Sequence, residues 1–263
     1  MPVLTVLQHL WDRVTGTQPA PPDWVVAVSG AAALIVVLTG SLWHLTRNAI
    51  TIAHEGGHAL VSLLAGRRLQ GIRLHSDTSG ETRSRGRPDG PGLVLPTLAG
   101  YLTPPLLGAG AAWLLAAHHV VLLLWLLLVL LGATLLAIRN AYGALAVLVT
   151  AAAVVAVSWL ATALVQAAFG YAAAWFLLLG GVRPIVELQR SRRRGRRSRG
   201  RPVRAGAVVW QGRAPESDAD QLAGLTRVPG GVWVGLFLLV AFAALALGAW
   251  LLVPGPLPLP RMH

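Results

Sequence analysis

The sequence predicts an all-α membrane protein, a polytopic bundle of about six or seven transmembrane helices that also carries a small β-hairpin. Hydrophobic residues make up 55% of the 263 residues and charged residues only 12%, about half the share of a soluble domain. The mean hydropathy is +0.62. The apolar residues are gathered into runs of about 20, the length at which a helix crosses a bilayer. The chain is therefore predicted to be an integral membrane protein.

Seven apolar runs are the candidate spans, and they divide the chain into four parts. The runs are 24–43, 48–65, 92–116, 119–137, 141–159, 162–181 and 231–253. The expected parts are an N-terminal interfacial segment at 1–23, the membrane core at 24–181, an arginine-rich cytoplasmic loop at 182–230, and a C-terminal transmembrane helix with its tail at 231–263. The second run is either a full span or a partly embedded helix that continues from the first run across Arg47.

The charges of the chain predict its orientation. All 22 basic residues are arginines, with six in loop 66–91 and twelve in loop 182–230. This clustering is the positive-inside pattern of a membrane protein, so both loops are predicted to be cytoplasmic. Seven crossings place the N-terminus in the cytoplasm and the C-terminus outside, and six crossings with one re-entrant helix are the alternative. Because membrane topology accounts for the net charge of +12, nucleic acid is not expected as a partner.

The two polar loops have different predicted structures. Residues alternate between apolar and polar over 69–85, and the Asp-Thr-Ser-Gly sequence at 77–80 is typical of a hairpin turn. Such a hairpin offers an edge strand to an extended peptide, and a solvated loop is the alternative. Residues 190–216, rich in Arg, Ser and Gly, are predicted to be flexible or to contact anionic lipid headgroups. A helix is expected to begin near Ser217, its N-cap.

Prolines, glycines and one asparagine carry further structural expectations. Pro104 and Pro105 predict a kinked span that lines a cavity open to water. Gly56 and Gly57 favour close helix packing or leave room for a scissile peptide. Asn140 is predicted to cap the helix that follows it.

A His-Glu-x-x-His motif lies within the second apolar run. His54 and His58 are four residues apart, so both imidazoles lie on one face of a helix and can reach one metal ion. Glu55 is the only acidic residue in the middle of a long apolar run, and it is the candidate catalytic base that polarises a metal-bound water. The alternative is that the histidines bond to neighbouring helices while burial neutralises Glu55.

A catalytic zinc site needs a third protein ligand, and the chain has no cysteine to supply one. Asp218 and Asp220 are the leading candidates, because zinc accepts carboxylates and few others are available, and Glu187 is another. A purely structural alternative for Asp218 is the N-cap of a helix. His118 and His119 are predicted to lie on the far side of the membrane.

Together these motifs resemble the site-2 protease family of intramembrane zinc metalloproteases, in its compact actinobacterial-type branch. The resemblance covers most of the chain, from residue 45 to residue 250. It rests on AHEGGHAL at 53–60, SDTSGETRSR at 76–85, AGYLTPPLLG at 99–108, IRNAYG at 138–143, LLLGGVRPIVEL at 177–188 and SDADQLAGLTRVPGGVW at 217–233.

The resemblance implies that His54 and His58 bind zinc, that Glu55 is the catalytic base, and that an aspartate from a later segment completes the site. Most relatives carry this aspartate in a Leu-Asp-Gly motif, which this chain lacks. Its role therefore passes to Asp218, in the Ser-Asp-Ala sequence that begins the segment at 217–233.

The predicted function is that of an intramembrane zinc metalloprotease, which cleaves a membrane-anchored protein substrate by zinc-activated water with a glutamate base. The expected location is a bacterial plasma membrane, with the lipid bilayer as the surroundings and the arginine-rich loops in the cytoplasm. The alternative is a non-catalytic metal-binding scaffold or a cation transporter, although the sequence shows no internal repeat of the kind that transporters often carry. Neither the substrate nor the oligomeric state is predicted.

Overall fold

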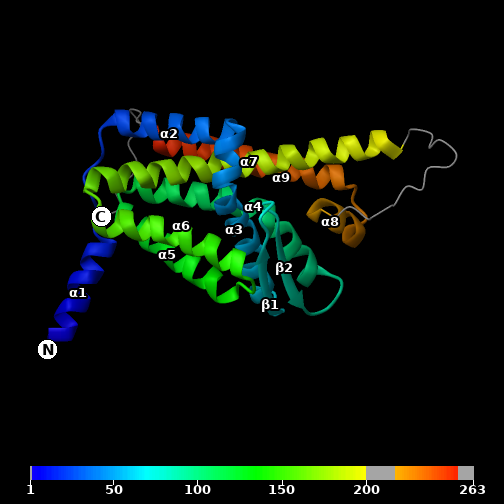
Figure 1. Cartoon of the computed structure of the whole chain (residues 1–263), viewed down its shortest axis with the longest axis horizontal. Coiled ribbons are helices and arrows are strands. Elements are labelled where there is room, and N and C mark those ends of the chain that lie inside the picture. The colour runs from blue at the N-terminus through cyan, green and yellow to red at the C-terminus, as the bar shows by residue number, and fades with distance from the viewer. Residues whose placement is uncertain (1, 200–216, 254–263) are drawn as a thin grey trace.

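The computed structural model describes residues 2–199 and 217–253, which form helices and one hairpin (Figure 1). Two stretches considered above, residues 200–216 and 254–263, lie outside the described residues. The elements in chain order are α1 (Pro2–Thr15), α2 (Asp23–Leu38), α3 (Gly40–Leu64), β1 (Arg68–Leu74), β2 (Gly80–Arg85), α4 (Pro91–Ala116), α5 (Val120–Ala137), α6 (Ala141–Leu160), α7 (Ala163–Arg199), α8 (Asp218–Thr226) and α9 (Gly230–Leu252).

Five of these helices, α4, α5, α6, α7 and α9, are long and apolar enough to cross a membrane. Helices α2 and α3 together qualify as a sixth candidate, but they are bent by 102° where they meet. The all-α membrane bundle with a small hairpin is thus confirmed, with five or six candidate spans in the described residues. Of the two topologies that the sequence leaves open, six crossings agree better with these candidates, because α3, which carries the histidine motif, is bent off α2 and is not a separate candidate span.

The bend between α2 and α3 lies at Thr39. Helix α2 ends at Leu38, Thr39 has an extended backbone with φ −81° and ψ 118°, and α3 begins at Gly40. A β-branched residue followed by glycine is a weak point in a helix, because both residues have low helix propensity. The helix that carries the histidine motif thus continues across Arg47, as one of the two interpretations of the sequence has it, and its break from α2 lies at Thr39.

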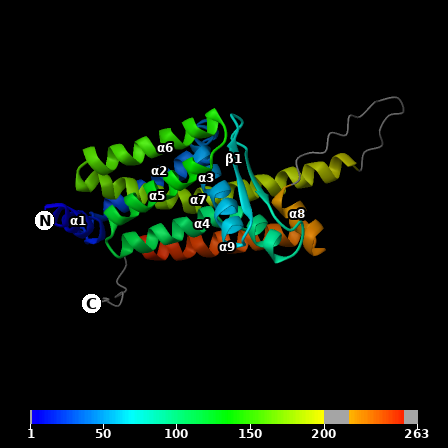
Figure 2. The ribbon, with the colours of Figure 1, turned by 90° about the horizontal axis from the view of Figure 1, so that it is seen from below.

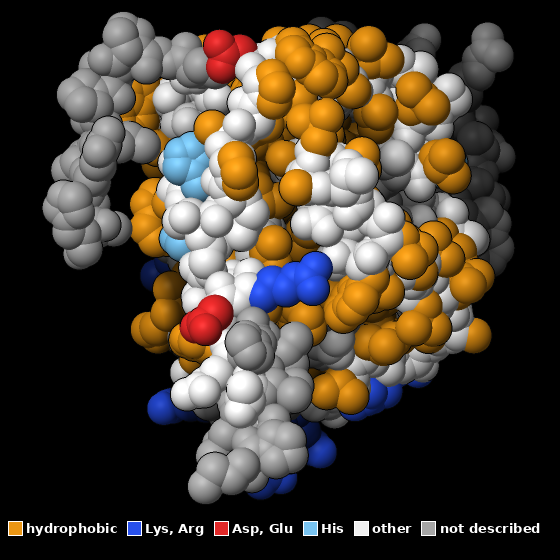
Figure 3. All heavy atoms as spheres, turned by 90° about the vertical axis from the view of Figure 1, so that its left-hand side faces the viewer, with side chains coloured by type: hydrophobic (Ala, Val, Ile, Leu, Met, Phe, Trp, Pro, Cys, Tyr) orange, Lys and Arg blue, Asp and Glu red, His pale blue; other side chains and the backbone are white. Residues whose placement is uncertain are grey.

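The two ends of the bundle differ in composition. The hairpin and α8 lie at one end, whereas α2 begins and α9 finishes at the other (Figure 1 and Figure 2). Viewed end-on, this second end shows mostly hydrophobic and uncharged groups (Figure 3). Because the described residues hold five or six candidate spans, the sides of the membrane on which the two chain ends lie stay a prediction.

The hairpin follows α3 directly and packs against the α5–α6 connection. Strands β1 and β2 are antiparallel, with Ile72 opposite Thr82, and the turn at residues 75–79 agrees with the sequence. Ile72 and Leu74 are fully buried, so the hairpin is not a solvated loop. The backbone N–H of Arg139 donates to the carbonyl of Ile72 at 2.9 Å and occupies the outer side of β1.

Asn140 completes this covered side of β1. Its side-chain amide donates to the Leu74 carbonyl at 2.7 Å, and its side-chain oxygen accepts from the Leu74 N–H at 3.2 Å. The side chain thus replaces the peptide group of a neighbouring strand, and it makes no cap hydrogen bond to α6, contrary to the prediction. Within the described residues, β2 is therefore the hairpin strand whose outer edge has no strand or loop paired to it.

Helix α4 lies at the centre and packs against α3, α7 and α9 (Figure 2). It continues from Pro91 to Ala116 as one helix although three prolines lie inside it. Pro105 is buried against α7, where a Cβ on Gly181 would lie 2.8 Å from the proline ring. The prolines are thus accommodated by close packing between two helices.

Helix α7 extends beyond the predicted span. It continues to Arg199, so residues 190–199 are helical. Arginine is a good helix former, and Ile185 and Leu188 are buried together with residues of α8 and α9, which stabilises the extension. Helix α8 begins where the sequence predicts, after Ser217, whose side chain accepts a hydrogen bond from the Asp220 N–H as the N-cap.

Candidate metal centre

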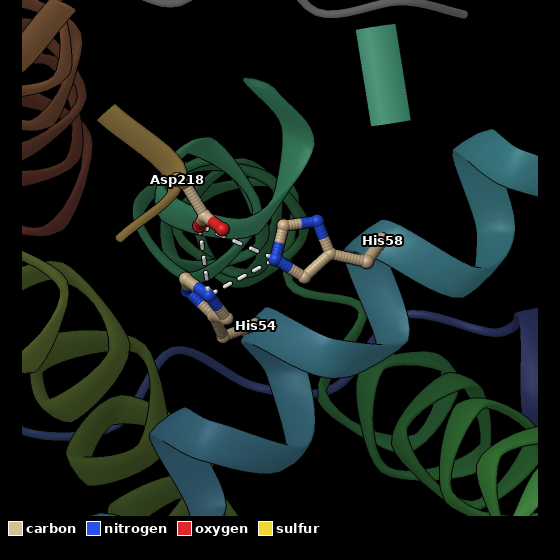
Figure 4. Close-up of side chains that lie close together, drawn as sticks. All are labelled: His54, His58 and Asp218. Atoms are coloured by element: carbon tan, nitrogen blue, oxygen red, sulfur yellow. Dashed lines mark hydrogen bonds and ion pairs between the residues drawn. The ribbon is translucent and has the colours of Figure 1, made fainter. Parts of the chain in front are cut away.

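Three side chains from two helices converge beside the hairpin end of the bundle (Figure 4). His54 and His58 lie one turn apart on α3, and their Nε2 atoms are 3.1 Å apart. The spacing of four residues places both rings on one helix face, as the sequence predicts. Asp218, the first residue of α8, brings its Oδ2 to 3.2 Å from His54 Nε2 and 3.3 Å from His58 Nε2.

This triangle has the dimensions of a zinc site. Ligand atoms bonded at about 2.0–2.1 Å to a tetrahedral zinc ion lie roughly 3.3 Å from one another. The observed separations are 3.1, 3.2 and 3.3 Å. Among the residues that the structure describes, Asp218 Oδ2 is also buried without a hydrogen-bond partner, although both ring nitrogens are so near. An unpaired buried oxygen beside two imidazoles is costly unless a cation satisfies it, so the three residues fit zinc.

The backbone of α4 supports the two rings. His58 Nδ1 lies 2.7 Å from the Pro96 carbonyl, which can only accept, so Nδ1 carries the proton and Nε2 keeps its lone pair for a metal. Gly100 leaves the necessary space, because a Cβ there would collide with His58 Nε2 and with His54 Cε1. The ring of Tyr101 meets His54 edge-on, with centroids 4.7 Å apart. These contacts restrict both imidazoles to orientations that face Asp218.

Helix α8 is held in place by its packing and by one arginine. It has only nine residues, too few to be stable alone. Leu222 is fully buried among residues of α7 and α9. Arg192 of α7 pairs with Asp220, lies 3.4 Å from Ser217 Oγ, and is 15% exposed at its side chain. Together these contacts fix the first turn of α8, and with it Asp218, against α3.

The other candidate ligands are engaged elsewhere. Asp220 is paired with Arg192 of α7. Glu187 Oε1 accepts from Arg183 Nε at 3.0 Å, and its Oε2 lies 3.2 Å from Arg47 Nη1. Among the described residues, neither carboxylate lies in the cluster of candidate metal ligands, and the carboxylate in that cluster belongs to Asp218.

Asp218 is free to act as a ligand because it is not the helix cap. Ser217 fills that role, so the Asp218 carboxylate is turned toward α3. Burial alone would raise the pKa of Asp218, but the neighbouring imidazoles, chiefly His58, hold that pKa below its ordinary range when they are protonated. An ionised carboxylate is the form that binds a metal. Residues 118–119 lie at the α4–α5 connection, at the opposite end of the bundle, as predicted.

Glu55 follows His54 on α3 and is only 4% exposed. Thr82 of β2 donates a hydrogen bond to its Oε2 at 2.7 Å, so the buried carboxylate has a polar partner from the hairpin. Gly57 lies against α4, where a Cβ would collide with the Thr103 side chain. Close helix packing, one of the two interpretations of this glycine, is therefore the one that its surroundings favour.

Several supporting residues were not predicted from the sequence. Thr82, Gly100, Arg192 and the Pro96 carbonyl act only through contacts that exist in the folded chain, so they match no motif. One of them, Thr82, could have been found from the sequence, because the alternation of apolar and polar residues over 69–85 places it on the buried face of the hairpin.

An apolar helical bundle with a His-His-Asp triangle beside a buried glutamate is the arrangement of a membrane-embedded metallopeptidase. The model of the family described as Peptidase M50B-like matches residues 27–248, which include the whole triangle and Glu55. The chain belongs to this family, whose members are membrane metalloproteases of the site-2 type. No curated protein and no solved structure gave a match.

Proposed function

We propose that the protein is an intramembrane zinc protease that hydrolyses a peptide bond in a membrane-anchored protein. The observation that carries this proposal is the triangle of ligand atoms, 3.1 to 3.3 Å apart, immediately beside a buried glutamate. His54, His58 and Asp218 would hold the ion and leave one position open, which is the pattern of catalytic rather than structural zinc. The family to which the chain belongs supports the same chemistry.

The proposed roles of the side chains follow from this arrangement. Zinc at this position would lower the pKa of a water molecule and polarise the scissile carbonyl. Glu55 accepts the proton of the water that attacks the carbonyl carbon, and the same carboxyl then gives the proton to the amine that leaves. The Pro96 carbonyl keeps the His58 ring in the tautomer that presents Nε2.

The hairpin offers a means to align the substrate. An extended peptide can add to a free strand edge through main-chain hydrogen bonds. The outer side of β1 is occupied by the α5–α6 connection, which leaves β2 as the proposed docking edge. Strand β2 also lies against the Glu55 carboxylate, so a peptide on this edge would lie near the proposed base. We place the arginine-rich end of the bundle in the cytoplasm of a bacterial cell.

Glu55→Gln tests the proposal most directly. The full chain is reconstituted in liposomes with a panel of quenched-fluorescent single-span peptides, and cleavage and zinc content are measured together. Loss of the base should lower kcat by about 1,000-fold, within the usual range for acid–base catalysis, while zinc content stays close to one ion per chain. Glu81→Gln is the matched control, because Glu81 lies on the hairpin and pairs with Arg83.

Two outcomes would contradict the proposal. Cleavage by Glu55→Gln at the rate of the wild type would exclude the glutamate as the base. Zinc flux into the liposomes without cleavage of any peptide in the panel would favour the cation transporter instead, and zinc binding without flux or cleavage would favour a metal-dependent scaffold.

A further inference from the structure

Helix α3 presents a second polar face, next to the one that carries the histidines. Thr51, Glu55 and Ser62 lie on this face, because residues four and seven apart align along a helix. Thr51 Oγ1 donates to the carbonyl of Thr78 at 2.9 Å, and Ser62 Oγ lies 3.4 Å from Ser84 Oγ. The hairpin therefore follows α3 along this face, with Glu55 in the middle of the contact.

Thr82 is the hairpin residue at this middle position. Its hydroxyl lies 2.7 Å from Glu55 Oε2 and 3.1 Å from the Glu55 backbone carbonyl. A hydroxyl that donates to a carboxylate forms one of the stronger hydrogen bonds, especially where water is excluded. Since Glu55 is 4% exposed, this bond is a main restraint on the direction in which its carboxylate points.

Gly80 lies against the other oxygen, Oε1, of the same carboxylate. Gly80 and Thr82 are two residues apart on β2, so they face the same side of the strand. A Cβ on Gly80 would lie 2.6 Å from Glu55 Oε1, closer than any real contact. The strand backbone thus lies directly against one carboxylate oxygen while the threonine hydroxyl holds the other.

The hairpin itself is fixed to the rest of the fold at both strands. The Asn140 side chain makes two hydrogen bonds to Leu74 of β1. Arg67 Nε donates to Ser84 Oγ of β2 at 2.9 Å, and its Nη1 donates to the Arg87 carbonyl at 2.7 Å. The position of Thr82 is therefore set by the anchored hairpin and not by Glu55 alone.

We propose that Thr82 is a positioning residue for Glu55. Through Thr82, strand β2, whose outer edge is the proposed docking edge for the substrate, also orients the catalytic base. This inference rests on the proposed role of Glu55. Thr82 would not touch the reacting atoms. Its contribution is to restrict Glu55 to the orientation in which the carboxylate can take the proton of the attacking water, so its loss should affect turnover more than substrate binding.

The kinetic test compares Thr82→Val with the wild type, both reconstituted in liposomes with the reporter peptide that the wild type cleaves best. The valine keeps the shape of the side chain and removes the hydroxyl. We expect kcat to fall by about 10- to 100-fold, the usual effect of losing a supporting hydrogen bond, with KM changed less than about threefold. Thr82→Ser should restore most of kcat. Thr150→Val makes the same change on α6, where the hydroxyl donates to the Ala146 carbonyl of its own helix. It is the matched control and should retain kcat within about threefold.

A second readout separates this inference from the proposed function. The infrared carboxylate bands of Glu55, assigned by difference from Glu55→Gln, should shift in Thr82→Val and return in Thr82→Ser, whether or not any peptide is cleaved. Unchanged bands, or an equal loss of turnover in Thr82→Val and Thr150→Val, would overturn the positioning role. Shifted bands in a chain that cleaves nothing would support the contact while refuting the protease.

Discussion

The two halves of the metal centre depend on the fold to very different degrees. His54 and His58 lie on a 25-residue helix, and their approach follows from helix geometry alone. Asp218 begins a nine-residue helix that reaches the histidines through its packing on α4 and α9 and through the ion pair with Arg192 of α7. The histidine pair is thus a local feature of the sequence, whereas the aspartate is placed by tertiary structure.

This difference implies two kinds of sensitivity. A change to a histidine removes a ligand from a scaffold that remains intact. A change near α8 can leave every ligand present and still move one of them, since short helices depend on packing for their stability. We therefore expect that replacing a histidine of α3 abolishes most of the zinc affinity at once, whereas substitutions around α8 lower the zinc affinity in graded steps.

Removing a histidine should have the largest effect on metal binding. His54→Ala or His58→Ala should lower zinc affinity by more than about 100-fold, beyond the usual range for residues that only support a ligand. Competition with a chromophoric chelator on the purified full chain measures this affinity. His44→Ala is the control, because His44 is exposed on the same helix. Wild-type affinity in either ligand variant would refute the histidine half of the centre.

Replacing the aspartate should have a smaller effect and should identify the third ligand. Asp218→Ala should weaken zinc binding by about 10- to 100-fold, because two imidazoles remain on α3. Asp220→Ala, two residues later, should cost less than about fivefold, since Asp220 supports α8 through a partly exposed ion pair with Arg192 and a hydrogen bond from Ser217 Oγ and is not one of the clustered ligands. The same chelator competition compares them, and the reverse order of effects would transfer the ligand role to Asp220.

The smallest effect is expected from the arginine that holds α8. Arg192→Gln removes the ion pair with Asp220 but no ligand, so zinc affinity should fall only a few-fold, in line with about 1 kcal/mol for such pairs. Arg193→Gln, the exposed neighbour on the same helix, should have no effect. Equal zinc affinities in the two variants would show that packing around Leu222, and not the ion pair of Arg192, places α8. The position of Asp218 would then depend on apolar packing alone, unlike the positions of the two histidines.

Much of this architecture follows from local patterns in the sequence. The histidine spacing, the hairpin turn at 77–80 and the N-cap at Ser217 are each written in a few consecutive residues, and the structure has all three. Asp218 was chosen as a ligand from composition and family resemblance, and the structure brings it to the histidines. These features are predictable because their geometry depends on neighbours in the chain.

The features that were not predicted depend on contacts between distant segments. Hydropathy measures how apolar a run is but not the angle at Thr39, so it leaves open whether α3 is a separate span or continues from α2. Asn140 was expected to cap a helix because its type favours caps, yet the exposed edge of β1 provided a better partner. The alternation over 69–85 places Thr82 on the buried face of the hairpin, but it does not identify Glu55 as the partner, because Glu55 belongs to another element.

Gly100 shows that a helix without a ligand can still decide whether the ligands meet. The volume that a methyl group would fill at this position is the volume that the two imidazole rings occupy. The centre is therefore built as much by an atom that is missing from α4 as by the atoms that α3 and α8 supply. An inventory of polar side chains overlooks such a residue, and a substitution as small as alanine there should exclude both rings at once.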